Sequence, residues 1–201
     1  MEDQTGKAVE PEKKESLTKT LMLYLHDLVH MLAIVMLVLM LLFRMVIVSG
    51  SSMYSTLWDG DWLLLLSSTF YTEPQYGDIV VACKDSFRGG EPIVKRVIAT
   101  EGQTVDIDFQ KGIVYVDGVA LEEDYTYTLT TNPEGMVFPL VVDEGCVFVM
   151  GDNRRDSMDS RHPQIGLVDT REILGKALFI LFPGTDEGRM QRNFDRIGAL
   201  N

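Results

Sequence analysis

Three short runs of the chain hold residue types that could carry out chemistry. A serine-rich run, SGSSMYSTL, covers residues 49–57, an apolar run at 93–99 contains Lys95 and Arg96, and a charged run, GDNRRDSMDSR, covers 151–161. Serine becomes a nucleophile only when a base removes its proton. Two of the three histidines, His26 and His30, lie in or beside a long apolar run, which leaves only His162 for a Ser-His-Asp triad. A Ser-Lys pair is the other known arrangement.

Lys95 stands in the middle of an apolar run that is typical of a β-strand. Successive strand residues face opposite sides of a sheet, so Lys95 shares a face with Ile93 and Val97. A buried lysine loses the hydration of its charged form, which lowers its pKa and lets the neutral amine accept a proton. The alternative is an edge strand on which the lysine opposes aggregation. The strand alone leaves both interpretations open.

The charged run at 151–161 also has two interpretations. It follows the apolar strand CVFVM and combines six charged residues with two serines. As an exposed loop, it would hold local Asp–Arg pairs that contribute little to stability. As a buried loop, its charges would have to form a fully paired network.

The composition excludes several classes of protein. Hydrophobic residues make up 46% of the 201 residues, enough to bury a core, so a wholly disordered chain is excluded. The net charge of -12 argues against nucleic-acid binding, which needs a basic surface. Two cysteines, Cys83 and Cys146, are too few for a disulfide scaffold, and whether they bond to each other stays open. The histidines lack metal-ligand spacing, so we expect neither a metal nor a cofactor.

A long apolar run precedes the serine motif. Residues 31–43 are all apolar, and a window at 28–48 includes only two polar residues near its ends. Twenty-one helical residues reach roughly 30 Å, the thickness of the hydrocarbon core, so 28–48 is predicted to be a transmembrane anchor. A cleaved signal and a buried core helix are the alternatives.

Lysines before the span and their scarcity after it predict a single-pass protein of the cell membrane, with a cytoplasmic N-terminus. Residues 1–27 are expected to be a largely disordered cytoplasmic tail.

The region at 49–183 is predicted to be an extracytoplasmic all-β catalytic domain, because short runs rich in Val, Ile, Phe and Tyr alternate with turn residues. The stretch IDFQKGIVYVDGVAL predicts hairpins that turn near Lys111-Gly112 and at Asp117-Gly118. Residues 184–201 are predicted to be a polar C-terminal tail. The fold class is thus all-β, with folded antiparallel sheets after one transmembrane helix.

Anchor, serine motif, lysine strand and GDNRxxSxDSR-like run, in this order, resemble the compact form of the bacterial type I signal peptidases. The resemblance covers roughly residues 28–183. It implies a serine endopeptidase that cleaves signal peptides from exported preproteins at the outer face of the membrane. The implied nucleophile is Ser52 and the implied general base is Lys95. Ser157 matches the serine that hydrogen-bonds and orients the lysine, and Met53 matches a hydrophobic residue of the substrate pocket.

The resemblance also implies structural ion pairs and partners. Arg96 would pair with Asp152, and Asp159 would pair with Arg161. The implied partners are preproteins with small residues before the cleavage site, the lipid bilayer and the export channel, with no nucleic acid.

Two departures from the family pattern concern the serine motif. Ser55 stands where the family usually has proline, which would fix the backbone of the turn. Gly50 stands where some members supply a serine hydroxyl to the oxyanion hole. A membrane-tethered domain that binds exported chains without cutting them is therefore the second hypothesis. A soluble self-cleaving Ser-Lys protein is the third, and the predicted anchor argues against it.

Overall fold

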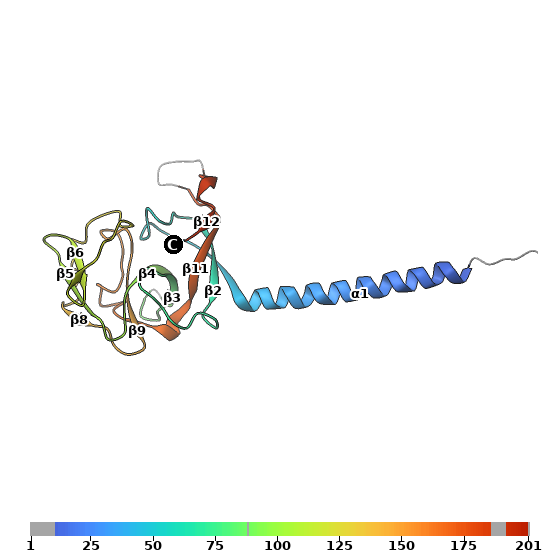
Figure 1. Ribbon diagram of the computed structural model, residues 1–201. Helices are drawn as coiled ribbons and strands as arrows, with labels where there is room; N and C mark the ends of the chain where they lie inside the picture. The colour runs from blue at the N-terminus through green and yellow to red at the C-terminus, as the bar shows by residue number, and fades with distance from the viewer. Residues whose placement is uncertain (1–10, 88, 186–191, 201) are drawn as a thin grey trace, which may run out of the picture. The chain divides into compact units, whose positions relative to one another are not determined.

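A computed structural model of the protein describes residues 11–200 except 88 and 186–191, with side chains from 17 onward (Figure 1). The chain divides into two units, residues 1–41 and 42–201. The first unit contains all but the last residue of the helix α1, Pro11–Leu42. The second contains the β-strands and the three sequence runs that could carry chemistry.

The helix α1 begins at Pro11, well before the predicted anchor at 28–48. Proline is favoured at the first position of a helix, and the Glu- and Lys-rich turns after Pro11 have high helix propensity. Residues 11–27, expected to be a disordered tail, are therefore helical, whereas 1–10 lie outside the described residues. Its segment Leu17–Leu42 has no buried residue and is long and apolar enough to cross a membrane.

The helix also ends earlier than predicted, at Leu42. Residues 43–47, expected within the anchor, form strand β1 (Phe43–Ile47), which pairs antiparallel with β2 (Trp62–Ser67). Apolarity alone does not separate a helix from a strand in a short run. Here Phe43 pairs with Leu66 and Ile47 with Trp62, so the sheet supplies hydrogen-bond partners that helical residues would find in their own segment.

Two antiparallel sheets make up the second unit, as expected for an all-β domain (Figure 1). The larger sheet has the order β1-β2-β11-β3-β4-β9-β10, and β12 pairs with β11; the smaller has the order β7-β6-β5-β8. The remaining strands are β3 (Ile79–Cys83), β4 (Pro92–Thr100), β5 (Thr104–Asp108), β6 (Ile113–Val116), β7 (Val119–Ala120), β8 (Leu140–Val141), β9 (Cys146–Met150), β10 (Val168–Asp169), β11 (Ile173–Phe182) and β12 (Gly198–Ala199).

Both predicted hairpin turns are confirmed. The strands β5 and β6 pair around Gly112, and β6 and β7 pair around Asp117-Gly118. Asp117 and Gly118 have φ values of 52° and 78°, the left-handed conformation that a two-residue hairpin of this type requires.

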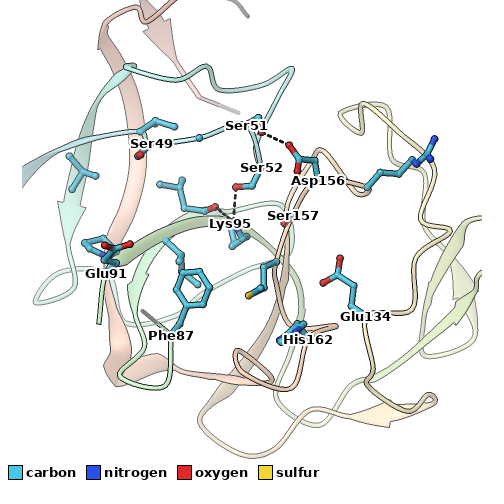
Figure 2. Close-up of a pocket in the computed structure, with 18 of the residues that line it drawn as sticks. Ser49, Ser51, Ser52, Phe87, Glu91, Lys95, Glu134, Asp156, Ser157 and His162 are labelled. Carbon is cyan, nitrogen blue, oxygen red and sulfur yellow. Dashed lines mark hydrogen bonds between the residues drawn. The ribbon is translucent and has the colours of Figure 1, made fainter. Parts of the chain in front are cut away.

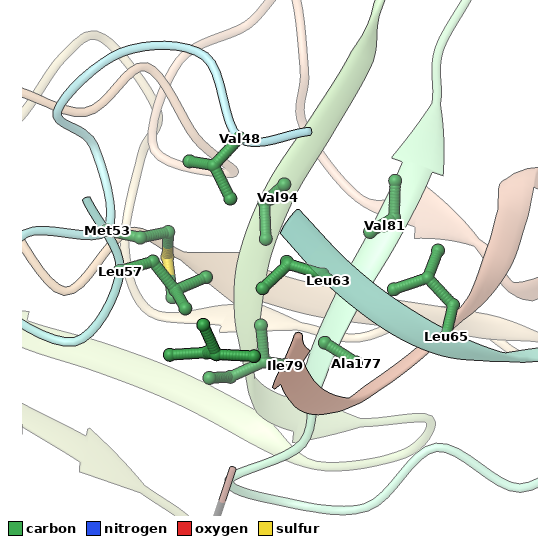
Figure 3. Close-up of a cluster of buried hydrophobic side chains, with 10 residues drawn as sticks. Val48, Met53, Leu57, Leu63, Leu65, Ile79, Val81, Val94 and Ala177 are labelled. Carbon is green, nitrogen blue, oxygen red and sulfur yellow. The ribbon is translucent and has the colours of Figure 1, made fainter. Parts of the chain in front are cut away.

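The core beside the serine motif joins strands of the larger sheet to the loop that follows β1. Figure 3 shows Met53 and Leu57 of that loop packed among strand residues. The cluster consists of Val48, Met53, Leu57, Leu63, Leu65, Ile79, Val81, Val94, Ala177 and Ile180. The apolar residues of the serine motif therefore hold its loop against the sheet.

The C-terminal segment is part of the folded domain rather than a separate polar tail beginning at 184. Phe194–Arg196 form a short 3₁₀ helix, η2. Strand β12 then pairs with β11, and Leu200 packs against the core cluster. Two strand residues and one leucine in a polar stretch give too short a pattern for sequence periodicity to detect.

Gly175 of β11 provides a test of this packing. The strand pairs with β2 on one side and β3 on the other, and a Cβ at Gly175 would lie 2.1 Å from the Leu66 carbonyl oxygen. We expect Gly175→Ala to lower the free energy of unfolding by about 3 kcal/mol through overpacking. Urea unfolding of the detergent-solubilised chain measures this. Gly198→Ala is the matched control, because nothing lies within 4 Å of a Cβ there; equal stability of the two variants would contradict the packing.

Candidate active site

The serine motif lies in a closed loop between β1 and β2. The Val48 N–H donates to the Asp61 carbonyl oxygen at 2.8 Å, and the Gly60 N–H donates to the Val48 carbonyl oxygen at 2.9 Å. These two bonds close the base of the loop, which we call the serine loop (residues 48–61). Because Met53 and Leu57 fill its inner side, the neighbouring Ser52 is left to line a cleft.

Lys95 approaches Ser52 from the sheet. It lies in the middle of β4, opposite Val80 of β3, and is 4% exposed, so it is not an exposed edge lysine. Its Nζ lies 2.6 Å from Ser52 Oγ and donates to the Val94 carbonyl oxygen at 3.0 Å. Figure 2 shows the Ser52 and Lys95 side chains directed toward each other.

The electrostatics of Lys95 favour the neutral amine. Burial lowers the pKa of Lys95 to about 8, whereas the negative charges of Asp159, Asp152 and Glu134 act in the opposite direction. A neutral amine within hydrogen-bond distance of a serine hydroxyl can accept its proton.

Most of the charged run at 151–161 is buried: its charged residues Asp152, Arg154, Asp159 and Arg161 are buried and paired, whereas Arg155 and Asp156 are exposed. Arg96 donates from Nε to Asp152 Oδ1 at 2.9 Å and from Nη2 to Oδ2 at 2.8 Å. Arg161 donates to both oxygens of Asp159, each at 2.8 Å. Burial by itself would raise the pKa of Asp159, but the Arg161 guanidinium and the Gly151 N–H lower it below its usual value. The buried charges of the run therefore form the paired network, and only Arg155, Asp156 and Met158 are exposed.

Ser157 lies in the cleft, but its hydroxyl has a different partner from the one expected. Ser157 Oγ donates to Asp159 Oδ2 at 2.8 Å. Among the described residues, Lys95 Nζ bonds to Ser52 and Val94 rather than to Ser157. A hydroxyl has one hydrogen, and the carboxylate, being the stronger acceptor, takes it.

Met53 does not line the cleft, which corrects the expectation that it belongs to the substrate pocket. Its side chain is 1% exposed and packs in the core cluster of Figure 3. A side chain this deeply buried has no surface left for a ligand. Its contribution is to anchor the turn that carries Ser52.

Several residues that support the site were not identified from the sequence. The Asn153 N–H donates to the Ser52 carbonyl oxygen at 3.0 Å, and Thr56 Oγ1 donates to Asp152 Oδ2 at 2.5 Å. Ser51 Oγ donates to Asp156 (Figure 2), and Asn153 Nδ2 donates to the Ser51 carbonyl oxygen at 3.2 Å, so four hydrogen bonds join the serine loop to the charged run among the described residues. All four residues stand inside the two motif runs, but spacing does not tell which side chains cross between them.

Glu134 is a further acidic residue of the cleft. Its carboxylate lies 3.6 Å from Arg161 Nη2, and its Oε2 is buried without a hydrogen-bond partner among the described residues. Burial raises the pKa of Glu134 to about 7. No motif surrounds it in the sequence, so no signal pointed to it.

The cleft has a volume of about 1020 Å³. Its lining comes from the end of β1, the beginning of the serine loop, the segment before β4 and the first half of β4, the connection between β7 and β8, and the charged run with the residue that follows it. These residues are Val46, Ile47, Val48, Ser49, Gly50, Ser51, Ser52, Phe87, Glu91, Pro92, Ile93, Val94, Lys95, Asn132, Glu134, Arg155, Asp156, Ser157, Met158 and His162. Apolar strand residues therefore form one wall, beside the Ser52–Lys95 pair.

The comparison with protein families agrees with this geometry. The family model "Signal peptidase, peptidase S26" matches residues 21–182, which include the whole cleft lining. The chain belongs to the signal peptidase I family.

Relatives within the family match most of the chain. "Signal peptidase I" of Bacillus amyloliquefaciens is 37% identical over 162 residues, covering 77% of this chain and 81% of the relative. "Probable signal peptidase I-1" of Synechocystis sp. is 37% identical over 171 residues, covering 79% and 84%. The crystal structure of a signal peptidase I from Enterococcus faecalis V583 is 32% identical, with a TM-score of 0.43, and covers 52% of this chain and 97% of that one. As a signal peptidase I, the protein is a serine endopeptidase that cleaves signal peptides.

The buried Arg96–Asp152 pair gives a testable expectation for stability. Its side chains are 3% and 0% exposed, so Asp152→Ala leaves a buried guanidinium without its partner. We expect a loss of about 3–5 kcal/mol in the free energy of unfolding. Lys111→Ala is the control, because the Lys111–Asp108 pair is exposed and its removal should change stability little. If both variants unfold at the same urea concentration, the buried pair does not hold the charged run in place.

Proposed function

We propose that this signal peptidase I cleaves its substrates by a Ser-Lys mechanism, with Ser52 as nucleophile and Lys95 as general base. The observation that carries the proposal is the 2.6 Å contact between Ser52 Oγ and a buried Lys95 Nζ in the cleft. Such contact between a hydroxyl and a base of lowered pKa is the requirement for activating serine.

The steps follow from this geometry. Neutral Lys95 takes the Ser52 proton while Oγ forms a bond to the scissile carbonyl carbon. The C–N bond then breaks, the Lys95 ammonium returns the proton to the departing amine, and an ester remains on Ser52. A water molecule, deprotonated by Lys95, attacks the ester, and the proton returns to Ser52 Oγ as the acid product leaves.

A backbone N–H group can stabilise the oxyanion that develops during the reaction. The Ser52 N–H donates to no acceptor among the described residues, whereas the Ser51 carbonyl oxygen of the same peptide group accepts from the Tyr54 N–H at 3.0 Å and from Asn153 Nδ2 at 3.2 Å. A fixed peptide plane with a free N–H is a preorganised donor, and one such donor contributes about 10²–10³ in rate in other systems. Gly50 brings no hydroxyl, so the backbone donor carries this task.

The cleft wall suits an extended peptide. The strand β1 is the outermost strand of the larger sheet, and Val46–Val48 line the cleft. A peptide could add to this edge through its backbone and place its small side chains against the apolar wall. Substrates with small residues before the cut fit such a surface.

Ser157 has an indirect role in this proposal. Its hydroxyl holds Asp159, and the Asp159 charge acts on the pKa of Lys95. Ser157 thus keeps the Asp159 carboxylate in place near Lys95. Its oxygen lone pairs remain able to accept a hydrogen bond from the Lys95 amine.

The orientation in the membrane is part of the proposal. Lys7, Lys13 and Lys14 precede the segment Leu17–Leu42, Lys19 lies in its first turn, and after Arg44 the next basic residue is Lys84. This distribution favours a cytoplasmic N-terminus and a catalytic domain at the outer face. There the exported preproteins emerge, with the lipid bilayer and the export channel as further partners.

Cleavage of a preprotein with an Ala-x-Ala site tests the catalytic pair directly. We expect the native chain to cut at the signal junction, and Ser52→Ala and Lys95→Met to show no measurable cutting, because each removes one member of the pair. Gel analysis of the products with detergent-solubilised protein measures this. Cutting by either variant, with the domain shown to be folded, would sink the mechanism.

The pH dependence tests the role of Lys95 separately. Since the base must be neutral, kcat/KM should rise with pH and level off above an apparent pKa of about 8. The same lowered pKa predicts that stability rises between about 8 and 10.5, where the unfolded lysine holds its proton and the folded one has released it. Urea unfolding of Lys95→Met should lack this contribution. An acid limb near the pKa of a carboxylate would instead assign the base to another residue.

A further inference from the structure

Arg196, five residues before the end of the chain, contacts the serine loop. It lies in η2, just before β12 joins the larger sheet beside β11. Its guanidinium carbon lies 3.9 Å from the centre of the Trp58 ring, and its Nη2 donates to the Thr56 carbonyl oxygen at 2.9 Å. A residue at one end of the domain thus touches two residues of the loop that carries Ser52.

Asp61 joins Arg196 to the base of the same loop. Arg196 donates from Nη1 to Asp61 Oδ1 and from Nη2 to Oδ2, each at 2.8 Å, in the two-pronged geometry that makes such pairs strong. The Trp58 and Gly184 N–H groups also donate to this carboxylate, which is 0% exposed. The pair therefore fixes the end of the loop from inside the protein.

Thr56 connects this contact to the catalytic side of the loop. Its carbonyl oxygen accepts from Arg196, and its hydroxyl donates to Asp152, the partner of Arg96 next to Lys95. Thr56 is consequently held at its carbonyl oxygen by the C-terminal segment and at its hydroxyl by the charged run. Ser52 lies four residues before it, in the same closed loop.

We propose that Arg196 is a positioning residue for Ser52, acting by clamping the serine loop through Asp61 and Thr56. The inference rests on the Ser-Lys mechanism proposed above. The reason for such a clamp is geometric: Lys95 is held by a sheet strand with neighbours on both sides, whereas Ser52 is on a loop. A misplacement of about 1 Å in a reacting group can cost about 10²-fold in rate.

The test compares two arginines of the C-terminal segment in the full-length chain. Arg196→Met keeps an unbranched apolar stem but removes the guanidinium that forms the clamp. Arg192→Met is the matched control, because Arg192 also stacks on an aromatic ring, Phe182, and donates to the backbone oxygen of Pro183, with no hydrogen bond or ring contact to the serine loop among the described residues. Each variant is assayed for kcat, KM, the pH profile of kcat/KM and thermal unfolding in detergent.

For Arg196→Met, we expect kcat to fall by at least about tenfold, with KM and the acid limb near the pKa of Lys95 unchanged. Arg192→Met should retain native kcat. Arg196→Lys restores the charge but not the fork that reaches Asp61 and Thr56 together, so its kcat should be intermediate. A double-mutant cycle with Asp61→Asn should show less than additive loss in kcat, because both changes remove the same clamp.

Two outcomes would overturn the proposal. One is equal kcat in Arg196→Met and Arg192→Met; the other is a loss in Arg196→Met that disappears when the assay temperature is lowered to match its Tm deficit, which indicates global stability alone. Failure of the mechanism itself is distinguishable, since it would appear as Ser52-independent cutting in the chain with Arg196 intact.

Discussion

The burial of Lys95 is the constraint on which the rest of the site depends. A lysine in the middle of a sheet loses its hydration, and this loss brings its pKa close to neutrality. The surrounding protein must exclude water from the amine. It must also limit the negative charge near the amine, because carboxylates raise the pKa of Lys95 and favour its charged form. Arg161 and Arg96 meet this condition by pairing with Asp159 and Asp152, so the carboxylates that support the loops oppose the lowered pKa only in part.

The same constraint explains why so many charges lie inside a small domain. Arg154 is fully buried, yet it donates to Glu123 and Thr130, and the Tyr125 ring lies 4.1 Å from the guanidinium carbon of Arg96. These partners come from the connection between the smaller sheet's strands β7 and β8. A charged loop this deeply buried is stable only when every member has a partner. The smaller sheet thus contributes to a site from which its strands are absent.

The sequence was a better guide to the residues that could carry chemistry than to the positions where the helix and the strands begin and end. Lys95 and the charged run stood out because charged residues are unusual within or beside apolar strands, and the Asp117-Gly118 hairpin because its backbone needs φ above zero. Ser52 was assigned only through the resemblance to signal peptidases, because a run rich in serine and glycine also suits a flexible linker. Met53 could not be placed, since an apolar residue beside a nucleophile suits either a pocket or a core. The helix end at Leu42 was missed for a related reason: residues 43–47 are apolar enough for a membrane, and only their pairing with β2 makes them a strand.

The contacts that complete the site also span most of the chain. Lys95 is 43 residues from Ser52, the Ser51–Asp156 contact spans 105 residues, and Arg196 reaches Thr56 across 140. Closing such distant contacts carries an entropic cost that local turns avoid, and strand pairing in the sheets offsets part of this cost by bringing the same segments together. The geometry that makes Ser52 reactive is therefore a product of the complete domain rather than of its motifs. The serine loop can hold Ser52 in a fixed position only because a buried strand, the charged run and the C-terminal segment all contact it.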